Sequence, residues 1–161
     1  MLGKPYTIYI FKHYYKKTID IVSEIWYNIF MDEKSCVIYV GGKFSLEWYY
    51  DKNGKSAAYD YFEEATEELQ NKFLILIKKM GDFGKIFDKT KFRNEGDGIY
   101  AFKPQPDRYL SFFTDDKKII VTNGFVKKTD KLPKNEKNLA IKYRQDYFER
   151  KTGGKNNGIN I

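Results

Sequence analysis

Apolar and polar positions follow the two-residue period of β-strands in three segments of the second half of the chain. These segments span residues 97–103, 108–114 and 118–126. Two prolines within residues 104–107 separate the first pair, and Asp115-Asp116-Lys117 separates the second, as is typical of tight turns. Connections this short predict hairpins and therefore antiparallel pairing.

A helical period of three to four residues marks the segment that follows Ser56, a residue type that can cap a helix. The apolar positions of this period are Ala58, Tyr61, Phe62, Ala65, Leu69, Phe73, Leu76, Ile77 and Met80. A run of some twenty-five residues is long for one globular helix. We therefore expect a break near Thr66 that gives two antiparallel helices, and we expect Gly81 and Gly84 to end the second one.

A last helix is predicted after Pro133, which can occupy a first helical position. Its apolar stripe consists of Leu139, Ala140, Tyr143 and Tyr147. Gly153-Gly154 ends it, and residues 153–161 are predicted to be a flexible tail.

The first third of the chain predicts a strand at Phe44–Tyr50, which the turn Asp51–Gly54 ends. We place the start of the core domain near Lys43, giving a domain of residues 43–152. We assign residues 1–42 to an N-terminal extension with the order β-α-β: strand-like at 7–15, helical at 19–30 and strand-like at 36–40. The fold class is α+β, with an antiparallel sheet, paired N-terminal helices and a C-terminal helix in the order β-α(α)-β-β-β-α.

The net charge of +7 is concentrated in the C-terminal part of the 161-residue chain. Residues 117–155 hold twelve Lys and Arg against four Asp and Glu, whereas residues 1–116 hold seventeen against eighteen. A cationic region in a small domain predicts a polyanionic partner, above all nucleic acid. A solvated, charged helix is the alternative explanation.

Several other chemistries are disfavoured by the residues present. His13 and Cys36 are single residues of their types, and we expect Cys36 to be a small buried hydrophobe. Gly41-Gly42-Lys43 lacks the rest of a phosphate-binding loop. We expect no metal ion, no small-molecule cofactor and no Ser or Cys catalytic triad. We also expect no signal peptide and no membrane span, and therefore a cytoplasmic protein.

The remaining candidate site is a set of cations at the ends of the three strands. Lys91 and Arg93 precede the first strand, Lys103 ends it, Arg108 begins the second, and Lys127-Lys128 closes the third. Metal-independent RNA cleavage needs a base, positive charge around the phosphorus and an acid, and Lys and Arg can supply charge and protons. Aromatic residues could stack on bases, although alternation directs about half of them into the core: Tyr100, Tyr109, Phe112, Phe113 and Phe125.

Residues 98–133 resemble the RelE/ParE toxin superfamily, in particular its phage-derived, HigB-type branch. The matching stretches are Gly98–Lys103, Arg108–Phe113, Asn123–Thr129, Pro133, and a last helix with Ala140, Arg144 and Tyr147. The similarity covers about residues 44–152. Lys103 departs from the Arg that relatives often have, and residues 1–42 have no counterpart in the usual short toxin.

The resemblance implies the toxin of a type II toxin-antitoxin pair, a ribosome-dependent endoribonuclease of messenger RNA that a helix-turn-helix antitoxin neutralises. By position it implies a catalytic set of Lys103, Arg108, Lys127 and Lys128. The implied RNA or ribosome contacts are Lys91, Arg93, Tyr109, Lys131 and Arg144. The general base is not assigned. Two alternatives stay open: a non-cleaving toxin that inhibits a partner such as DNA gyrase, and an inactive nucleic-acid-binding relative.

Overall fold

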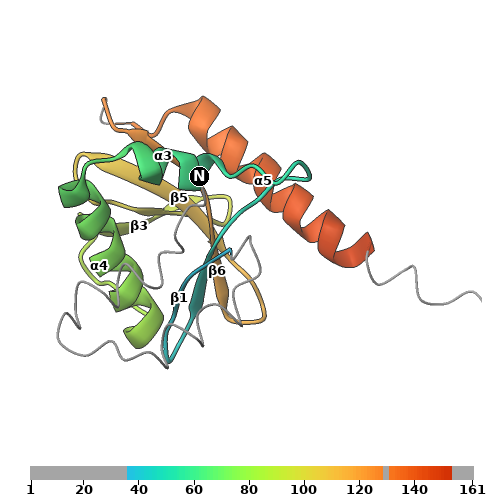
Figure 1. The fold of residues 1–161 in the computed structure, drawn as a ribbon, viewed down its shortest axis with the longest axis horizontal. Helices are drawn as coiled ribbons and strands as arrows, with labels where there is room; N and C mark the ends of the chain where they lie inside the picture. Colours follow the sequence, from blue (N-terminus) through green and yellow to red (C-terminus); the bar gives the residue numbers. More distant parts are fainter. Residues whose placement is uncertain (1–35, 129–130, 154–161) are drawn as a thin grey trace, which may run out of the picture.

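The computed structural model describes residues 36–128 and 131–153, which form one sheet with helices on both faces (Figure 1). The elements of this part of the chain are β1 Val37–Val40, β2 Ser45–Trp48, α3 Ala57–Glu64, α4 Glu67–Phe83, β3 Phe92–Gly96, β4 Ile99–Phe102, β5 Asp107–Phe113, β6 Lys118–Val126 and α5 Lys134–Gly153. The predicted α+β class is confirmed.

The sheet has the strand order β1-β2-β6-β5-β4-β3. Strands β3 to β6 form an antiparallel meander, as their short connections predict. In contrast to the predicted all-antiparallel sheet, β2 pairs with β6 in parallel, with Ser45 opposite Lys118. A parallel pair needs a long crossover, and the helices and hairpins between β2 and β6 provide one.

The paired helices form as predicted, because two side chains cap them. The Ser56 hydroxyl accepts a hydrogen bond from the Tyr59 amide, and Thr66 caps α4 by accepting from the Leu69 amide. Gly84, with φ of 72°, ends α4. Gly81 does not end the helix: it lies inside α4, where a Cβ atom would come within 2.8 Å of the Tyr39 ring.

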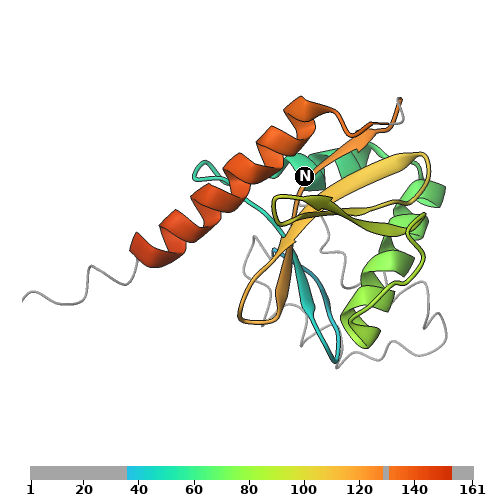
Figure 2. The ribbon, with the colours of Figure 1, turned by 180° about the vertical axis from the view of Figure 1, so that it is seen from behind.

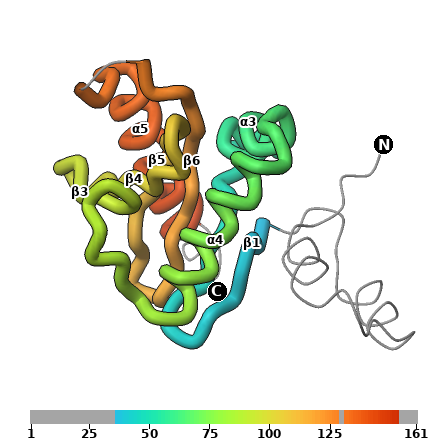
Figure 3. The backbone as a smooth tube through the Cα atoms, turned by 90° about the vertical axis from the view of Figure 1, so that its left-hand side faces the viewer, coloured from blue at the N-terminus to red at the C-terminus, as the bar shows by residue number. Residues whose placement is uncertain are grey.

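Strand alternation gives the sheet two apolar faces, each covered by a different part of the chain. Figure 3 shows α3 and α4 on one side and α5 on the other. The α3/α4 side buries the larger core, in which Phe73 stacks on Trp48 and on Tyr109. The α5 side buries a smaller core around Leu110, Phe112 and Ala140. Its helix runs obliquely over the sheet, leaving part of that face without a helix (Figure 2).

Two edge strands differ from the sequence prediction. The strand expected at residues 36–40 is present as β1, but it pairs antiparallel with β2, so the sheet begins inside the segment assigned to the N-terminal extension. Strand β3 was not predicted, because its sequence Phe-Arg-Asn-Glu-Gly has little apolar content. The strand and helix expected at 7–15 and 19–30, and most of the predicted tail, lie outside the described residues.

Among the described helices, none combines the length and apolar content needed to cross a membrane.

Candidate active site

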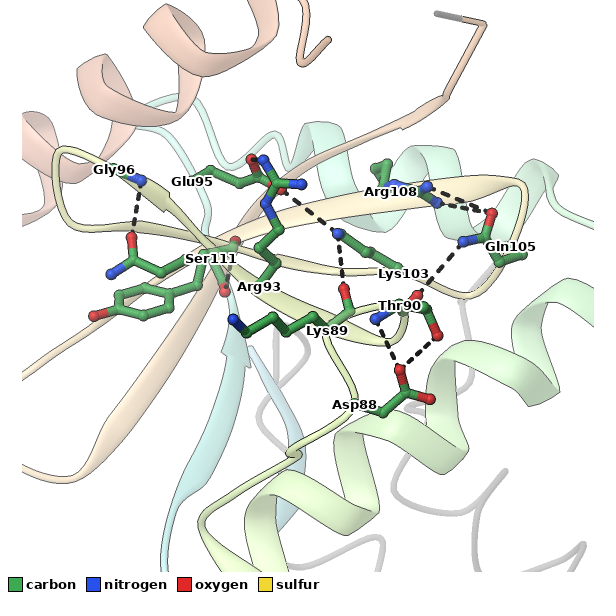
Figure 4. A network of polar contacts seen from close by, with 12 residues as sticks. Asp88, Lys89, Thr90, Arg93, Glu95, Gly96, Lys103, Gln105, Arg108 and Ser111 are labelled. Carbon is green, nitrogen blue, oxygen red and sulfur yellow. Dashed lines mark hydrogen bonds and ion pairs between the residues drawn. The ribbon is translucent and has the colours of Figure 1, made fainter. Parts of the chain in front are cut away.

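The register of strands β3 to β6 brings four cations to one end of the α5 side of the sheet. Arg93 of β3 lies opposite Ala101 of β4, and Lys103 follows Ala101 by two residues, so Arg93 and Lys103 lie on the same face of the sheet. Ala101 in turn lies opposite Leu110, so Arg108, two residues earlier, shares this face. Phe125 lies opposite Arg108, and Lys127 follows it by two residues. We call Arg93, Lys103, Arg108 and Lys127 the cation cluster; Figure 4 shows the first three of them.

Lys103 is almost completely buried, with 7% of its surface exposed. Its Nζ donates a hydrogen bond of 3.0 Å to the Lys89 carbonyl oxygen. Burial lowers the pKa of the Lys103 ammonium; Glu95 opposes this effect, and the charges of Arg93, Arg108 and Lys127 add to it. Lys103 is therefore a lysine whose environment favours release of a proton.

Arg108 is also buried, with 6% of its surface exposed. Its Nη1 donates a hydrogen bond of 2.7 Å to the Asp107 carbonyl oxygen, and Nη1 and Nη2 both approach Gln105 Oε1 at 3.4 Å. Burial lowers the pKa of the guanidinium, yet an arginine keeps its charge in proteins. Within the described ranges, no carboxylate lies within ion-pair distance of Arg108, so its positive charge remains available to an anion.

Glu95 is the functional candidate that the sequence analysis missed. Its side chain is 10% exposed, and Oε2 lies 3.6 Å from Arg93 Nη2 while Oε1 lies 3.9 Å from Lys103 Nζ. Figure 4 shows this carboxylate between the two cations. In the sequence, Glu95 stands two residues after Arg93. This spacing places the two side chains on one face only if the segment is a strand, and β3 was not predicted.

The other predicted basic contacts lie around the ends of the same elements. Lys91 directly precedes β3, and its carbonyl oxygen accepts a hydrogen bond of 2.8 Å from the Lys103 amide. Lys128 follows β6, and Lys131 lies just before α5. All three are exposed. Of the predicted catalytic set, the structure brings Lys103, Arg108 and Lys127 together, whereas Lys128 is the next residue along and is exposed to solvent.

Tyr109 is not available as a stacking surface, which corrects its assignment as an RNA contact. It lies opposite Phe102 on the α3/α4 side of the sheet and is completely buried. Its ring stacks on Phe73 with a centroid distance of 4.0 Å. Of the other aromatic candidates, Phe112 and Phe125 are buried, while Tyr100 and Phe113 are half-buried and in edge contact.

Arg144 anchors α5, which gives this predicted RNA contact a structural role. Its Nη1 donates a hydrogen bond to the Asp97 carbonyl oxygen, and Lys137 Nζ lies 2.6 Å from the carboxylate of the same Asp97. Both cations therefore tie the helix to the β3–β4 turn. Farther along, Arg150 donates to the Tyr50 carbonyl oxygen, and Lys151 pairs with Asp116 at 3.0 Å.

Asp107 lies directly behind the cation cluster on the opposite side of the sheet. It is 1% exposed, and its Oδ1 has no hydrogen-bond partner in the described structure. Burial raises the pKa of the Asp107 carboxyl, although a hydrogen bond from Tyr61 lowers it. Among the residues described, no group of three or more His, Cys, Asp or Glu side chains is placed to hold a metal ion.

A comparison with protein families finds a match that covers all of these cations. The model described as "Phage derived protein Gp49-like (DUF891)" matches residues 60–145, just over half of the chain. The matched segment runs from α3 into α5 and includes the cation cluster, Glu95, Lys91, Lys128, Lys131 and Arg144. No curated protein matches the chain.

Proposed function

The chain belongs to the Gp49-like family of phage-derived proteins, a RelE/toxin-like family, and on this premise we propose that it is a HigB-type toxin that cleaves messenger RNA on the ribosome. The proposal has two parts. Membership in the family supports a toxin of a toxin-antitoxin pair. The geometry of the cation cluster supports phosphodiester cleavage as the toxic activity.

The observation that carries the proposal is the pair of buried cations, Lys103 and Arg108, at the end of one face of the sheet. Burying a charge without a close counter-ion is unfavourable. Here the Lys103 ammonium and the Arg108 guanidinium donate mainly to neutral oxygens, of Lys89, Asp107 and Gln105. The one carboxylate at ion-pair distance from Lys103 in the described residues, Glu95, lies 3.9 Å from Nζ and pairs with Arg93 as well. An arriving phosphate would therefore add negative charge close to both buried cations, and its interactions would be strong because these side chains are largely shielded from water.

RNA cleavage by attack of the 2′-hydroxyl develops negative charge on the phosphoryl oxygens and on the departing 5′-oxygen. In the proposed mechanism, Arg108 presents its planar fork to the scissile phosphate. Lys103, whose pKa is lowered by burial, donates a proton to the 5′-oxygen as the phosphorus–oxygen bond breaks. Lys127 adds positive charge beside Lys103.

We further propose that three exposed lysines bind RNA outside the cleavage site. Lys91, Lys128 and Lys131 lie at the ends of β3, β6 and α5, where they would contact the RNA or ribosomal RNA backbone. Such contacts make binding depend strongly on salt, because each releases counterions. The proposed regulatory partner is an antitoxin, and we propose that it carries a helix-turn-helix.

Inducible expression with mapping of transcript ends tests this function. Expression of the full chain is expected to stop growth and to produce new messenger RNA ends inside translated regions. Arg108→Ala is expected to abolish both effects, whereas Lys142→Ala, which removes an exposed cation of α5, leaves both intact. Growth arrest with intact transcripts and altered DNA supercoiling would instead support a gyrase-inhibiting toxin. Normal growth with intact transcripts would support an inactive relative.

A further inference from the structure

The proposed RNA cleavage requires a group that removes the proton from the attacking 2′-hydroxyl. A general base must lie within reach of that hydroxyl while the scissile phosphate is held by the cations. Strands β3 to β6 present five ionisable groups at this place: Arg93 and Glu95 from β3, and Lys103, Arg108 and Lys127 from the ends of β4, β5 and β6. Only Glu95 among these five is an acid.

The position of the Glu95 carboxylate leaves both of its oxygens able to accept a proton. Oε2 faces Arg93 at 3.6 Å and Oε1 faces Lys103 at 3.9 Å. These distances are those of ion pairs and exceed hydrogen-bond length. The side chain is 10% exposed, so the carboxylate is shielded from bulk water but still reachable from the cluster.

A cation is a poorer candidate for this step. The Lys103 ammonium already donates to the Lys89 carbonyl oxygen, and a protonated lysine has no acceptor. Arginine keeps its protons in proteins. Lys103 could serve as a base only after losing its proton, and it would then no longer stabilise the phosphorane or protonate the leaving oxygen.

We propose that Glu95 is the general base of RNA cleavage and that Lys103 is the matching general acid. This inference rests on the proposed function. The 2′-hydroxyl proton passes to a Glu95 oxygen while the 2′-oxygen forms a bond to phosphorus. The bond from phosphorus to the 5′-oxygen breaks, and that oxygen takes a proton from the Lys103 ammonium. The products are a 2′,3′-cyclic phosphate and a 5′-hydroxyl end.

The adjacency of the two groups also explains how the enzyme returns to its starting state. After cleavage Glu95 carries a proton and Lys103 has lost one. Because Glu95 Oε1 and Lys103 Nζ lie 3.9 Å apart, one small movement or one bridging water can return the proton. Arg93 and Arg108 keep their charges throughout and continue to hold the phosphate.

The test is single-turnover cleavage of ribosome-bound messenger RNA by the purified full chain over the pH range in which ribosomes remain intact. Glu95→Gln keeps the size of the side chain but cannot take up the proton. We expect its rate to fall about 100- to 10,000-fold. RNA binding is expected to stay equal or to become tighter.

Glu95→Asp retains a base in a shorter side chain, so we expect partial activity that clearly exceeds the activity of Glu95→Gln. Glu149→Gln makes the same charge change at an exposed position of α5 and should behave as wild type. The thermal midpoint of each variant identifies any loss of folding.

Three outcomes would overturn the inference. Wild-type rate and pH profile in Glu95→Gln would remove Glu95 from the mechanism but leave RNA cleavage standing. Equal slowing of the Gln and Asp variants, with both proteins folded, would reduce Glu95 to a positioning residue. A wild-type chain that does not cut ribosome-bound RNA would overturn both this inference and the proposed function.

Discussion

Two groups of cations in this molecule carry similar charge but occupy very different environments. In the cation cluster, Lys103 and Arg108 are buried and donate mainly to neutral oxygens. On α5, in contrast, the anchoring cations are partly or fully exposed, and each contacts an oxygen of a turn or loop that the helix crosses: Lys137 and Arg144 contact Asp97, Arg150 contacts Tyr50 and Lys151 contacts Asp116. The α5 group fastens the helix, whereas the cluster is left to meet an anion.

The difference teaches that the location of net charge in a sequence is a poor guide to the location of a site. The excess charge begins near β6, but much of it serves to fix α5 to the β3–β4 turn and to the β5–β6 turn. The cluster draws three of its four cations from residues before position 117. Burial, rather than the count of charges, separates the two groups.

The largest expected effect comes from removing charge at Lys103. Lys103→Met keeps the length of the side chain and is expected to lower the cleavage rate about 100-fold or more. Folding should not be weakened greatly, because an apolar side chain replaces a buried charge. Single-turnover cleavage and thermal unfolding measure the two effects. Lys142→Met on α5 is the matched control and should leave both unchanged.

A conservative variant at the same position sharpens this prediction. Since burial lowers the pKa of Lys103, cleavage should decline on the alkaline side as the lysine loses its proton. Lys103→Arg should remove this decline, because arginine remains protonated. An alkaline decline that persists in Lys103→Arg would assign the acid to another group.

Substitution of Asp107, which directly precedes Arg108, should change the stability of the fold and not the rate of cleavage. Asp107 faces α3, and burial raises the pKa of its carboxyl above the usual 3.8. The unfolded chain therefore binds fewer protons, and stability falls as pH rises from 3.8 to the raised value. Asp107→Asn is expected to stabilise the protein by about 1 to 2 kcal/mol at neutral pH.

The gain in the free energy of unfolding of Asp107→Asn should shrink as the pH is lowered toward 3.8, because the wild-type carboxyl then becomes neutral as well. Chemical denaturation at several pH values measures it. A variant that is less stable than wild type at neutral pH would show that the Asp107 charge supports the fold.

Arg144 tests whether the cations of α5 stabilise the fold without taking part in cleavage. Arg144→Gln removes the hydrogen bond to the Asp97 carbonyl oxygen and should lower the free energy of unfolding by about 1 kcal/mol. Cleavage measured below the unfolding range should stay within about threefold of wild type, a difference well under 1.4 kcal/mol. A large loss of cleavage in a folded Arg144→Gln protein would return this residue to the RNA-binding set.

The smallest change in stability is expected for Asp116→Asn, at the place where α5 meets the β5–β6 turn. Hydrogen bonds from Thr114 and Lys151 lower the pKa of Asp116 to about 2, from 3.8. The contribution of the Asp116 carboxylate to the free energy of unfolding is therefore present above pH 3.8 and is lost as the pH falls toward 2. Because the group is exposed, Asp116→Asn should cost only about 0.5 kcal/mol at neutral pH, measured by denaturation. A stability difference that does not decrease in acid would contradict an ionic origin.

The sequence predicts most of the described fold, because its local signals agree with the packing. Ser56, Thr66 and Pro133 mark helix starts, and the alternation in β4 to β6 marks the strands. Strand β3 escaped detection since an edge strand can be polar on both faces. The parallel pairing of β2 with β6 is set by packing between distant segments, which no local pattern encodes.

The candidate site could be predicted only in part. Lys103, Arg108 and Lys127 stand at strand ends, a position visible in the sequence. The burial of Tyr109 depends on which face of β5 meets α4, and the anchoring role of Arg144 depends on where α5 crosses the β3–β4 turn. Glu95 could be recognised only after β3 was seen to pair with β4, which puts its carboxylate beside Lys103.

The most direct test of the central claim compares one residue from each group of cations in a single assay. The rate of ribosome-bound messenger RNA cleavage is measured for wild type, Arg108→Ala and Arg150→Ala, with thermal midpoints confirming that all three are folded. The account predicts a loss of about 100-fold or more for Arg108→Ala and a change within about threefold for Arg150→Ala. Equal losses in both variants, or a greater loss in Arg150→Ala, would contradict it.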